Sequence, residues 1–377
     1  MNTAFKIGVT GFGLIAVCYG FARFAFGLFL PEIDQQLSLG PTLSGFISGG
    51  SFLGYCIAII GSAALTERFG PRRVAVAASL VAAIGMIGIA TAPNAIWLAC
   101  AVLIAGSSTG LASPPMAAAV VAAVKDDQQN KTNATINAGT SVGVALSGPI
   151  ALLIAGEWRL AFGGFAVVAV IMAIISAINL PSSAKMAAQQ HRLPKLDGNV
   201  LRLIIAAFLM GAASTAVWSF GGKLATLRLG WDSSDVGVLW IAIGSAGIAG
   251  AYAGNLVARF GMNITHWLFL GLMAIGMLAI GFEGANTVTT FIGGALFGGS
   301  YVILTGVYLI WGVNALPRRP ATGLMIGFLM IAVGQTAGAP LFGIVLNTLG
   351  AAYAVLAFAI LSLLAGLARS GQKATFA

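Results

Sequence analysis

The chain has 377 residues, of which 59% are hydrophobic and only 8% are charged, and its formal net charge is +9. Soluble domains carry about 25% charged residues, so this composition excludes an ordinary soluble protein and indicates a membrane protein. The positive charge does not indicate nucleic-acid binding, because the basic residues fall mostly in alternate loops between apolar segments.

Apolar segments follow one another along the whole chain, each near the roughly 20 residues that a helix needs to cross a bilayer. Twelve such segments are expected, at residues 7–31, 42–64, 74–92, 95–124, 132–155, 160–180, 200–222, 233–256, 263–283, 287–313, 321–347 and 349–369. The first segment is too long for the core of a cleaved signal peptide, so it is expected to be a retained span.

The longest polar stretch between these segments, residues 181–199, separates six of them from six. We therefore predict an all-α membrane protein of twelve transmembrane helices in two pseudo-symmetric six-helix bundles. The expected units are an N-terminal bundle in residues 1–180, a cytoplasmic linker in 181–199 and a C-terminal bundle in 200–377.

The basic residues predict the orientation of these spans. Fifteen of the 19 lie on the side that carries both termini, and Arg159, Lys223 and Arg228 lie on the other side. The remaining basic residue, Arg23, lies inside the first apolar segment. Because cytoplasmic loops carry the excess of lysine and arginine, both termini are expected to be cytoplasmic.

The two halves of the chain contain similar segments. Residues 37–70 and 227–261 each begin at Leu-x-Leu-Gly, pass through one glycine-rich span and end at Arg-Phe-Gly. Residues 139–149 (GTSVGVALSGP) and 331–340 (IAVGQTAGAP) also resemble each other, and both end in a proline. Parallel repeats of six spans are typical of transporters, in which the ligand site lies at the repeat interface near the bilayer midplane.

The loop ALTERFGPRR, residues 64–73, resembles the first signature motif of the major facilitator superfamily of secondary transporters. The matching positions are Glu67, Arg68, Gly70, Arg72 and Arg73. The sequence departs from the family pattern in having glutamate at position 67 and Pro71 in place of a basic residue. The resemblance implies the major facilitator fold, with a charge relay at a cytoplasmic hinge that helps to gate transport. The alternative is a tight basic turn that only obeys the positive-inside rule.

A second resemblance lies in residues 139–162, which are similar to the span-five motif of antiporters and exporters in this superfamily. Gly148 and Pro149 match the motif, whereas Leu152 and Leu153 stand where the family has two glycines. The resemblance implies a gating role for Gly148 and Pro149, because proline removes one backbone hydrogen bond and can kink a helix. Such prolines also occur in ordinary transmembrane packing.

Arg23 is the most informative residue in the chain, because a guanidinium at membrane depth costs at least a few kcal/mol unless it is compensated. In an α-helix, Tyr19, Phe26 and Gly27 would share its face. Arginine binds carboxylate or phosphate groups in a bidentate manner and keeps its charge, so we predict an organic anion, or a polar molecule with one anionic group, as its partner. The alternative is a structural brace that bonds backbone carbonyls at a helix break or pairs with Glu32 or Glu283.

Residues 20–24, Gly-Phe-Ala-Arg-Phe, resemble the first span of a little-characterised bacterial branch of the superfamily, and that likeness implies no known substrate. The family fold implies a central cavity lined mainly by spans one, four, seven and ten. Candidate substrate-binding residues at mid-depth are Arg23, Tyr19, Asn137, Ser141, Trp218, Tyr301, Thr305 and Gln335. Further polar or aromatic candidates for the cavity are Ser107, Thr109, Trp240 and Tyr308. Lys223 is expected to be a rim cation or an interfacial residue that extends its amine to water.

Titratable groups are expected to be scarce within the bilayer. All ten acidic residues fall in loops or at span ends, unless Glu32 or Glu283 is drawn inward, and residues 97–115 contain no charge. The two histidines, His191 and His266, are expected to be solvated in or beside cytoplasmic loops. A buried proton carrier, which proton-coupled transporters usually contain, is therefore not predicted.

These patterns favour a secondary active or facilitative transporter that moves a small organic anion by alternating access. We expect a monomer in the bacterial inner (plasma) membrane, with the lipid bilayer and a small anionic substrate as partners and no nucleic acid. No catalytic motif, metal cluster or cofactor motif is found in the sequence, so no enzyme, metal or cofactor is predicted. The alternatives are a proton-driven exporter of amphipathic compounds and a non-transporting membrane receptor or scaffold.

Overall fold

The computed structural model describes residues 3–154, 156–182 and 197–371, and all regular structure within these ranges is helical. Eleven helical segments of the described chain are long and apolar enough to cross a membrane, and one shorter apolar helix follows them. The predicted all-α architecture of twelve membrane helices is therefore confirmed. Most of the predicted linker at 181–199 lies outside the described residues.

The first half of the chain forms the helices of the N-terminal bundle. Its first span is a continuous helical segment from Thr3 to Leu37, made of α1, the π-helix η1 and α2. The bounds are α1 Thr3–Ile15, η1 Ala16–Phe24, α2 Ala25–Leu37, α3 Gly40–Phe69, α4 Pro71–Ala90, α5 Ala95–Ala123, α6 Asp126–Ile154 and α7 Trp158–Asn179.

The second half forms the C-terminal bundle. The seventh span breaks after Trp218, and the short helix α9 follows it; the eighth span contains a short 3-10 segment, η2. The bounds are α8 Gly198–Trp218, α9 Gly221–Leu229, α10 Ser233–Gly247, η2 Ile248–Tyr252, α11 Ala253–Phe260, α12 Met262–Gly281, α13 Thr287–Ala315, α14 Pro320–Leu349 and α15 Ala351–Ala365.

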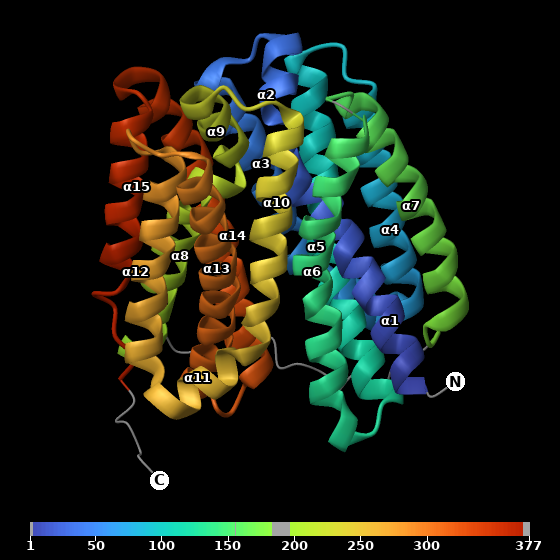
Figure 1. The fold of residues 1–377 in the computed structure, drawn as a ribbon. Helices are drawn as coiled ribbons and strands as arrows, with labels where there is room; N and C mark the ends of the chain where they lie inside the picture. The colour runs from blue at the N-terminus through green and yellow to red at the C-terminus, as the bar shows by residue number, and fades with distance from the viewer. Residues whose placement is uncertain (1–2, 155, 183–196, 372–377) are drawn as a thin grey trace.

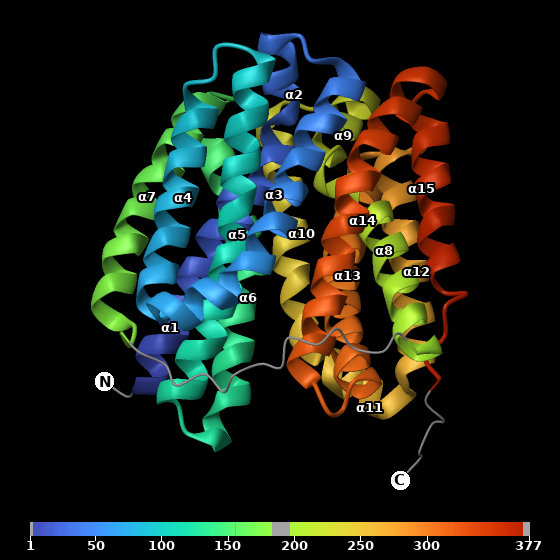
Figure 2. The same cartoon turned by 180° about the vertical axis from the view of Figure 1, so that it is seen from behind.

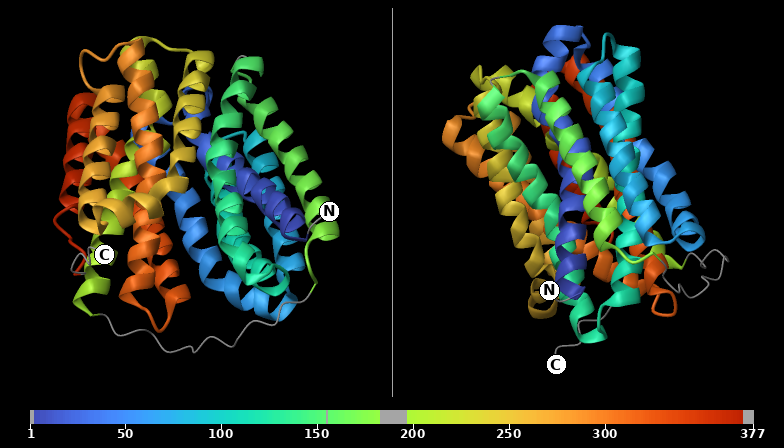
Figure 3. Two further views of the ribbon diagram at one scale, coloured as in Figure 1. Left: turned by 60° about the horizontal axis from the view of Figure 1, so that its bottom comes forward. Right: turned by 90° about the vertical axis from the view of Figure 1, so that its right-hand side faces the viewer.

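The two bundles lie side by side, with their helices roughly parallel to one long axis (Figure 1). Helices α2 and α9 lie together at one end of the molecule, and the view from behind shows the same arrangement (Figure 2). The start of α1 and the chain beyond α15 both lie towards the opposite end (Figures 1 and 3).

Glycines bring the two bundles into close contact near the α2 and α9 end. A Cβ atom on Gly45 of α3 would lie 2.5 Å from the carbonyl oxygen of Ala339 in α14. A Cβ on Gly148 of α6 would clash with the carbonyl oxygen of Gly237 in α10. Because α3 and α10 begin directly after α2 and α9, both contacts lie at that end. Small residues thus allow backbone-to-backbone packing that closes this end of the molecule.

The internal repeat seen in the sequence ends in the same backbone geometry in both halves, although α3 is continuous and its counterpart contains the 3-10 segment η2. Gly70 separates α3 from α4 with φ 81° and ψ 159°, and Gly261 separates α11 from α12 with φ 82° and ψ 158°. Residues with a Cβ rarely adopt this conformation, which explains glycine at both positions. The two proline-containing segments also correspond, because Gly148 packs on α10 and Pro340 packs on Gly49 of α3.

Candidate functional site

Arg23 lies in the π-helix η1 and is 6% exposed. At the end of η1 the backbone N–H of Ala25 donates to the carbonyl of Gly20, five residues earlier, which is the wider π-helical turn. This turn changes which residues share a face with Arg23, compared with a regular α-helix. Phe26 is consequently not among the aromatic rings that face the guanidinium, and the predicted gap at Gly27 is filled by the Trp218 carbonyl of α8.

Arg23 forms a hydrogen bond that joins the two bundles. Its Nη2 donates to Oε1 of Gln335 in α14 at 2.6 Å. The Nε2 of Gln335 donates to Ser214 Oγ in α8 and to the Tyr301 hydroxyl in α13, each at 3.2 Å. Gln335 is fully buried, and its amide nitrogen is held by side chains of two other helices of the C-terminal bundle, α8 and α13, while its oxygen faces the N-terminal bundle.

Aromatic rings surround the Arg23 guanidinium. Its Cζ lies 4.7 Å from the ring centre of Phe52, 4.8 Å from Tyr55, 5.1 Å from Phe24 and 5.7 Å from Tyr19. A cation over such rings gains about 0.5–2 kcal/mol per contact, depending on how fully it is desolvated. The rings therefore stabilise the buried charge without neutralising it.

Two rings of the C-terminal bundle complete this group. Trp218 packs on Phe24 with ring centres 4.2 Å apart, and Tyr301 lies 5.2 Å from Trp218. Tyr19 is held from the other side by a 2.9 Å hydrogen bond to Ser113 of α5. We call this group the Arg23 cluster. Its members are Arg23, Tyr19, Phe24, Phe52, Tyr55, Ser214, Trp218, Tyr301 and Gln335.

Polar atoms in and beside the cluster lack hydrogen-bond partners within the described chain. Arg23 Nε and Trp218 Nε1 are both buried and unbonded. Three hydroxyls on α3, those of Ser44, Ser48 and Ser51, are also buried and unbonded. An unsatisfied buried polar group costs about 1–3 kcal/mol, so Arg23 Nε and Trp218 Nε1, which lie between the bundles, are the groups best placed to bond a polar ligand. Ser51 instead packs against Gly106 of α5, within the N-terminal bundle.

No carboxylate in the described residues pairs with Arg23. The ion pairs found there join Lys223 to Asp34 and Arg228 to Glu283, the latter at 3.8 Å. Glu32 has a buried oxygen without a partner. The predicted alternative, in which Glu32 or Glu283 braces Arg23, is therefore wrong, and the bond to Gln335 takes its place.

The structure also corrects the prediction made for Lys223. It is 8% exposed and pairs with Asp34 of α2, whose other carboxylate oxygen accepts a 2.7 Å hydrogen bond from the Gly40 N–H. The break after Trp218 starts a new helix, α9, which turns this lysine towards α2. Lys223 is consequently neither a rim cation nor an interfacial residue, but half of an ion pair between the bundles.

Within the described residues, none of the other candidates from the sequence forms a hydrogen bond with the side chain of Arg23 or Gln335. Asn137 is exposed on α6, and Ser141 is buried at the contact of α6 with the end of α10. Thr305 bonds the carbonyl of Tyr301 within α13, at 2.9 Å. Ser107 and Thr109 likewise bond carbonyls of their own helix. By contrast, Trp240 reaches the first span and donates to the Phe24 carbonyl at 3.3 Å.

His266 was predicted to be solvated, and this prediction is wrong. The side chain is 1% exposed, and its Nε2 lies 2.9 Å from the Tyr308 hydroxyl, which in turn donates to the Ala206 carbonyl at 3.2 Å. Because α12 begins directly after Gly261, His266 lies one turn inside the helix and faces α13. His191 lies outside the described residues.

The signature loop lies at the end of the molecule that carries the termini. Arg72 Nε donates to the Leu180 carbonyl at 2.6 Å, which ties the start of α4 to the end of α7. Glu67, Arg68 and Arg73 are exposed. Glu67 forms no ion pair with a described residue. The predicted charge relay of this loop remains a prediction.

The amino-acid sequence matches the profile of the Major Facilitator Superfamily over residues 12–330. The chain belongs to the major facilitator superfamily. It is thus a multi-pass membrane protein of the major facilitator type. Two curated relatives are similar in sequence to this chain. The first, the uncharacterized transporter YgaY of Escherichia coli O157:H7, is 31% identical over 186 residues.

That alignment covers 47% of this chain and 44% of YgaY, so the chain spans less than half the length of that relative. An uncharacterized 38 kDa protein from the 23S RNA operon of Thermoproteus tenax is 26% identical over 369 residues, covering 94% of this chain and 92% of that protein. The second relative is thus similar over nearly the full length.

Solved structures of major facilitator transporters share the fold. The nucleoside transporter NupG superposes with a TM-score of 0.75 at 13% identity, over 98% of each chain. The xylose transporter XylE from E. coli gives a TM-score of 0.76 at 14% identity, over 97% of this chain and 98% of XylE. A bacterial homologue of the human lysosomal transporter Spinster gives 0.78 at 12% identity, over 97% and 96%. Identities this low establish the fold alone.

Proposed function

We propose that this protein moves a small organic anion across the bacterial inner membrane by alternating access, and that Arg23 binds the anionic group. The observation that carries the proposal is a buried guanidinium at the interface of two bundles with no carboxylate partner in the described chain. In alternating access the two bundles rock around a site near the midplane, where Arg23 and Gln335 meet.

The chemistry of the Arg23 cluster favours an anion with a single charge. Arg23 supplies one fixed positive charge, and Lys223, the next buried cation, is already paired with Asp34. Gln335, Tyr301 and Ser214 supply neutral hydrogen-bonding groups next to the guanidinium. A carboxylate is the simplest group that accepts bonds from Arg23 Nε and Nη2 together. Aromatic walls suit an apolar or planar body attached to that carboxylate.

The contacts between the bundles support a structure that is closed at the α2 and α9 end. The ion pair of Lys223 with Asp34 and the glycine contacts of α3 and α10 all lie there. The positive-inside rule favours cytoplasmic termini, so the closed end faces the outside and the opposite end the cytoplasm. We propose that a monomer carries the complete path, without an enzymatic step, a cofactor or nucleic acid.

A second candidate function is the proton-driven export of amphipathic compounds. The observation that favours it is the continuous group of aromatic rings across both bundles, which suits flat apolar molecules. Gly148 and Pro149 at the contact of α6 with α10 also resemble the exporter motif. A receptor or scaffold that binds a ligand without moving it is the third possibility, and only a flux measurement separates it from the transporters.

A thermal-shift screen of the purified protein tests the substrate class. A ligand that binds the folded state raises the melting temperature by mass action. We expect monocarboxylates with an apolar body to raise the melting temperature of the native protein by at least about 2 °C at saturation. Arg23→Gln should abolish this shift, because glutamine carries no charge to bind the anionic group. The matched control, Arg318→Gln, removes an exposed arginine and should keep the shift.

The panel also contains phosphorylated metabolites, neutral amphiphiles and cationic amphiphiles. Stabilisation by amphiphiles alone, equal in the native protein and in Arg23→Gln, would contradict the anion proposal and support the exporter. An anion that stabilises both proteins equally would show that Arg23 is not the anion-binding group.

A further inference from the structure

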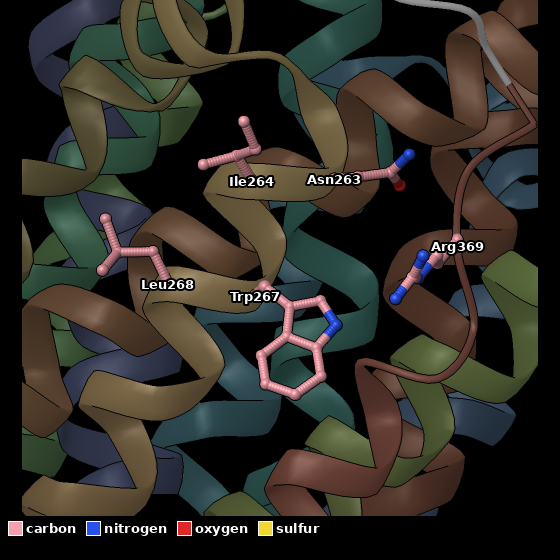
Figure 4. Close-up of a pocket in the computed structure, with 5 residues that line it drawn as sticks. All are labelled: Asn263, Ile264, Trp267, Leu268 and Arg369. Carbon is pink, nitrogen blue, oxygen red and sulfur yellow. The ribbon is translucent and has the colours of Figure 1, made fainter.

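A surface pocket lies beside the first turns of α12, at the end of the molecule that carries the termini. Its volume is about 430 Å³, and it is lined by Asn263, Ile264, Trp267, Leu268 and Arg369. Figure 4 shows the Arg369 guanidinium directed from the chain after α15 towards the Trp267 indole. Helices α12 and α15 form the outer edge of the C-terminal bundle (Figure 1). None of the residues that line the pocket belongs to the Arg23 cluster, so substrate transport does not account for it.

The polar and apolar groups of the pocket are separated along the helix. Asn263 and Arg369 form the polar part, at the second residue of α12 and in the segment after α15. Ile264, Trp267 and Leu268 are 61%, 44% and 51% exposed and continue the surface into the apolar span. Trp267 lies about 7 Å along the axis from the start of α12, at the depth where tryptophans mark a membrane interface.

Arg369 is the pocket's free hydrogen-bonding group. The Asn263 amide is occupied, since it donates to the Ser370 carbonyl at 3.2 Å and accepts from the Ser370 N–H at 2.8 Å. The Trp267 indole N–H donates to the Gly366 carbonyl at 3.0 Å. These bonds hold the segment after α15 against α12. The exposed guanidinium of Arg369 makes no hydrogen bond or ion pair with a described residue.

The charge around the pocket is positive. A Cβ on Gly371 would lie 3.8 Å from Arg202 Nη1, which places a second guanidinium beside the same segment. Arg259 lies at the end of α11, just before α12 begins. Basic groups at the rim of an apolar membrane-facing surface attract anionic lipid headgroups, which are enriched on the cytoplasmic side of membranes.

We propose that this pocket binds an anionic phospholipid. Arg369 contacts the headgroup phosphate, and an acyl chain lies along Ile264, Trp267 and Leu268. The bound lipid joins α12 to the segment after α15 and so stabilises the C-terminal bundle from the termini side. The amphipathic gradient and the free cation distinguish this site from a general lipid-facing surface, which lacks a fixed charge.

The test measures the melting temperature of the purified full-length protein in a neutral detergent with added short-chain lipid. Dihexanoyl phosphatidylglycerol should raise the melting temperature by at least about 2 °C, and dihexanoyl phosphatidylcholine should raise it by less than half as much. Arg369→Gln should remove the difference between the two lipids. Arg318→Gln, which removes an exposed arginine between α13 and α14, outside the pocket and its basic rim, should keep it.

Glycerol phosphate and inorganic phosphate are tested as ligands without an acyl chain. Neither should raise the melting temperature as dihexanoyl phosphatidylglycerol does. An equal shift with either of them would mean that the pocket binds a free phosphate, which overturns the lipid proposal. An unchanged preference for phosphatidylglycerol in Arg369→Gln would also overturn it. Should Arg369→Gln not fold, Ile264→Gln tests the acyl-chain contact instead, and native mass spectrometry counts the retained phosphatidylglycerol. Full retention by that variant contradicts the proposal.

Discussion

Replacing Asp34 with alanine is expected to open the bundle interface at the α2 and α9 end. The substitution leaves Lys223 buried without its counter-charge, since the two side chains are only 11% and 18% exposed. Removing one partner of a buried ion pair costs about 3–5 kcal/mol. The protein avoids this cost when α2 moves away from α9, because Lys223 then becomes hydrated. A cost of this size is enough to invert an equilibrium between two conformations of similar free energy.

Labelling of a cysteine at position 48 measures this opening. Ser48 lies on α3 beside Gly49, is 3% exposed and packs near the inter-bundle contact with α14. In a chain whose three native cysteines are replaced by alanine, Ser48→Cys should react slowly with a membrane-impermeant maleimide. Asp34→Ala should raise the rate at least about tenfold. Asp127→Ala, which removes an exposed carboxylate at the opposite end, should leave the rate unchanged.

A double substitution separates loss of charge pairing from general damage. Combining Asp34→Leu with Lys223→Leu removes both charges, and replacing a buried ion pair with apolar residues is often neutral. Slow labelling should therefore return in the double variant. If the cysteine at position 48 is labelled as slowly in Asp34→Ala as in its parent, the ion pair does not hold the α2 and α9 end closed.

Three glycine substitutions are expected to have three different outcomes. Gly148→Leu introduces a side chain at the contact of α6 with α10 between the bundles, where a Cβ would clash with the Gly237 carbonyl. The bundles can relieve this clash by separating, so we expect a folded protein that stays open at the α2 and α9 end. In this variant the cysteine at position 48 should be labelled at least about tenfold faster than in the Ser48→Cys parent, as in Asp34→Ala.

Gly54→Leu places the same side chain inside the N-terminal bundle, where a Cβ would clash with the Leu103 carbonyl of α5. Helices of one bundle cannot separate without unfolding, and overpacking of this kind costs about 1–3 kcal/mol or more. We expect a lower melting temperature with no gain in labelling. Gly164→Leu, at an exposed position of α7 with no atom within 4 Å, is the control and should change neither quantity.

The contrast between Gly148→Leu and Gly54→Leu tests whether the two bundles move as separate units. Equal losses of melting temperature in both variants, without faster labelling of Gly148→Leu, would contradict rocking at the contact of α6 with α10.

The sequence was sufficient to predict the helices, because each span is a long apolar segment bounded by polar or glycine-containing loops. That Arg23 would need partners inside the protein was also predictable, since the cost of a buried guanidinium does not depend on the details of packing. Gln335 is a candidate for a similar reason, since an amide at this depth requires partners, but the same reasoning also favours Asn137, which the structure leaves exposed.

The remainder of the Arg23 cluster depended on tertiary packing. The π-helical turn in η1 changes which residues share a face, and no residue pattern in the sequence signals it. Phe52 and Tyr55 lie on α3, and their distance to Arg23 follows only from the way α3 packs against the first span. The pairing of Lys223 with Asp34 depended on the break after Trp218, which hydropathy does not show.

Uptake into proteoliposomes tests the central claim, that Arg23 binds the transported anion, most directly. The measurement compares uptake of the most strongly stabilising radiolabelled monocarboxylate by the native protein, Arg23→Gln and Arg318→Gln at equal amounts of folded protein. We expect uptake by the native protein and by Arg318→Gln, and at least about a tenfold loss in Arg23→Gln, since an interaction with a charged group contributes about 1.5–3 kcal/mol. Equal uptake by Arg23→Gln and the native protein would contradict the claim, and binding without uptake in the native protein would indicate a receptor or scaffold.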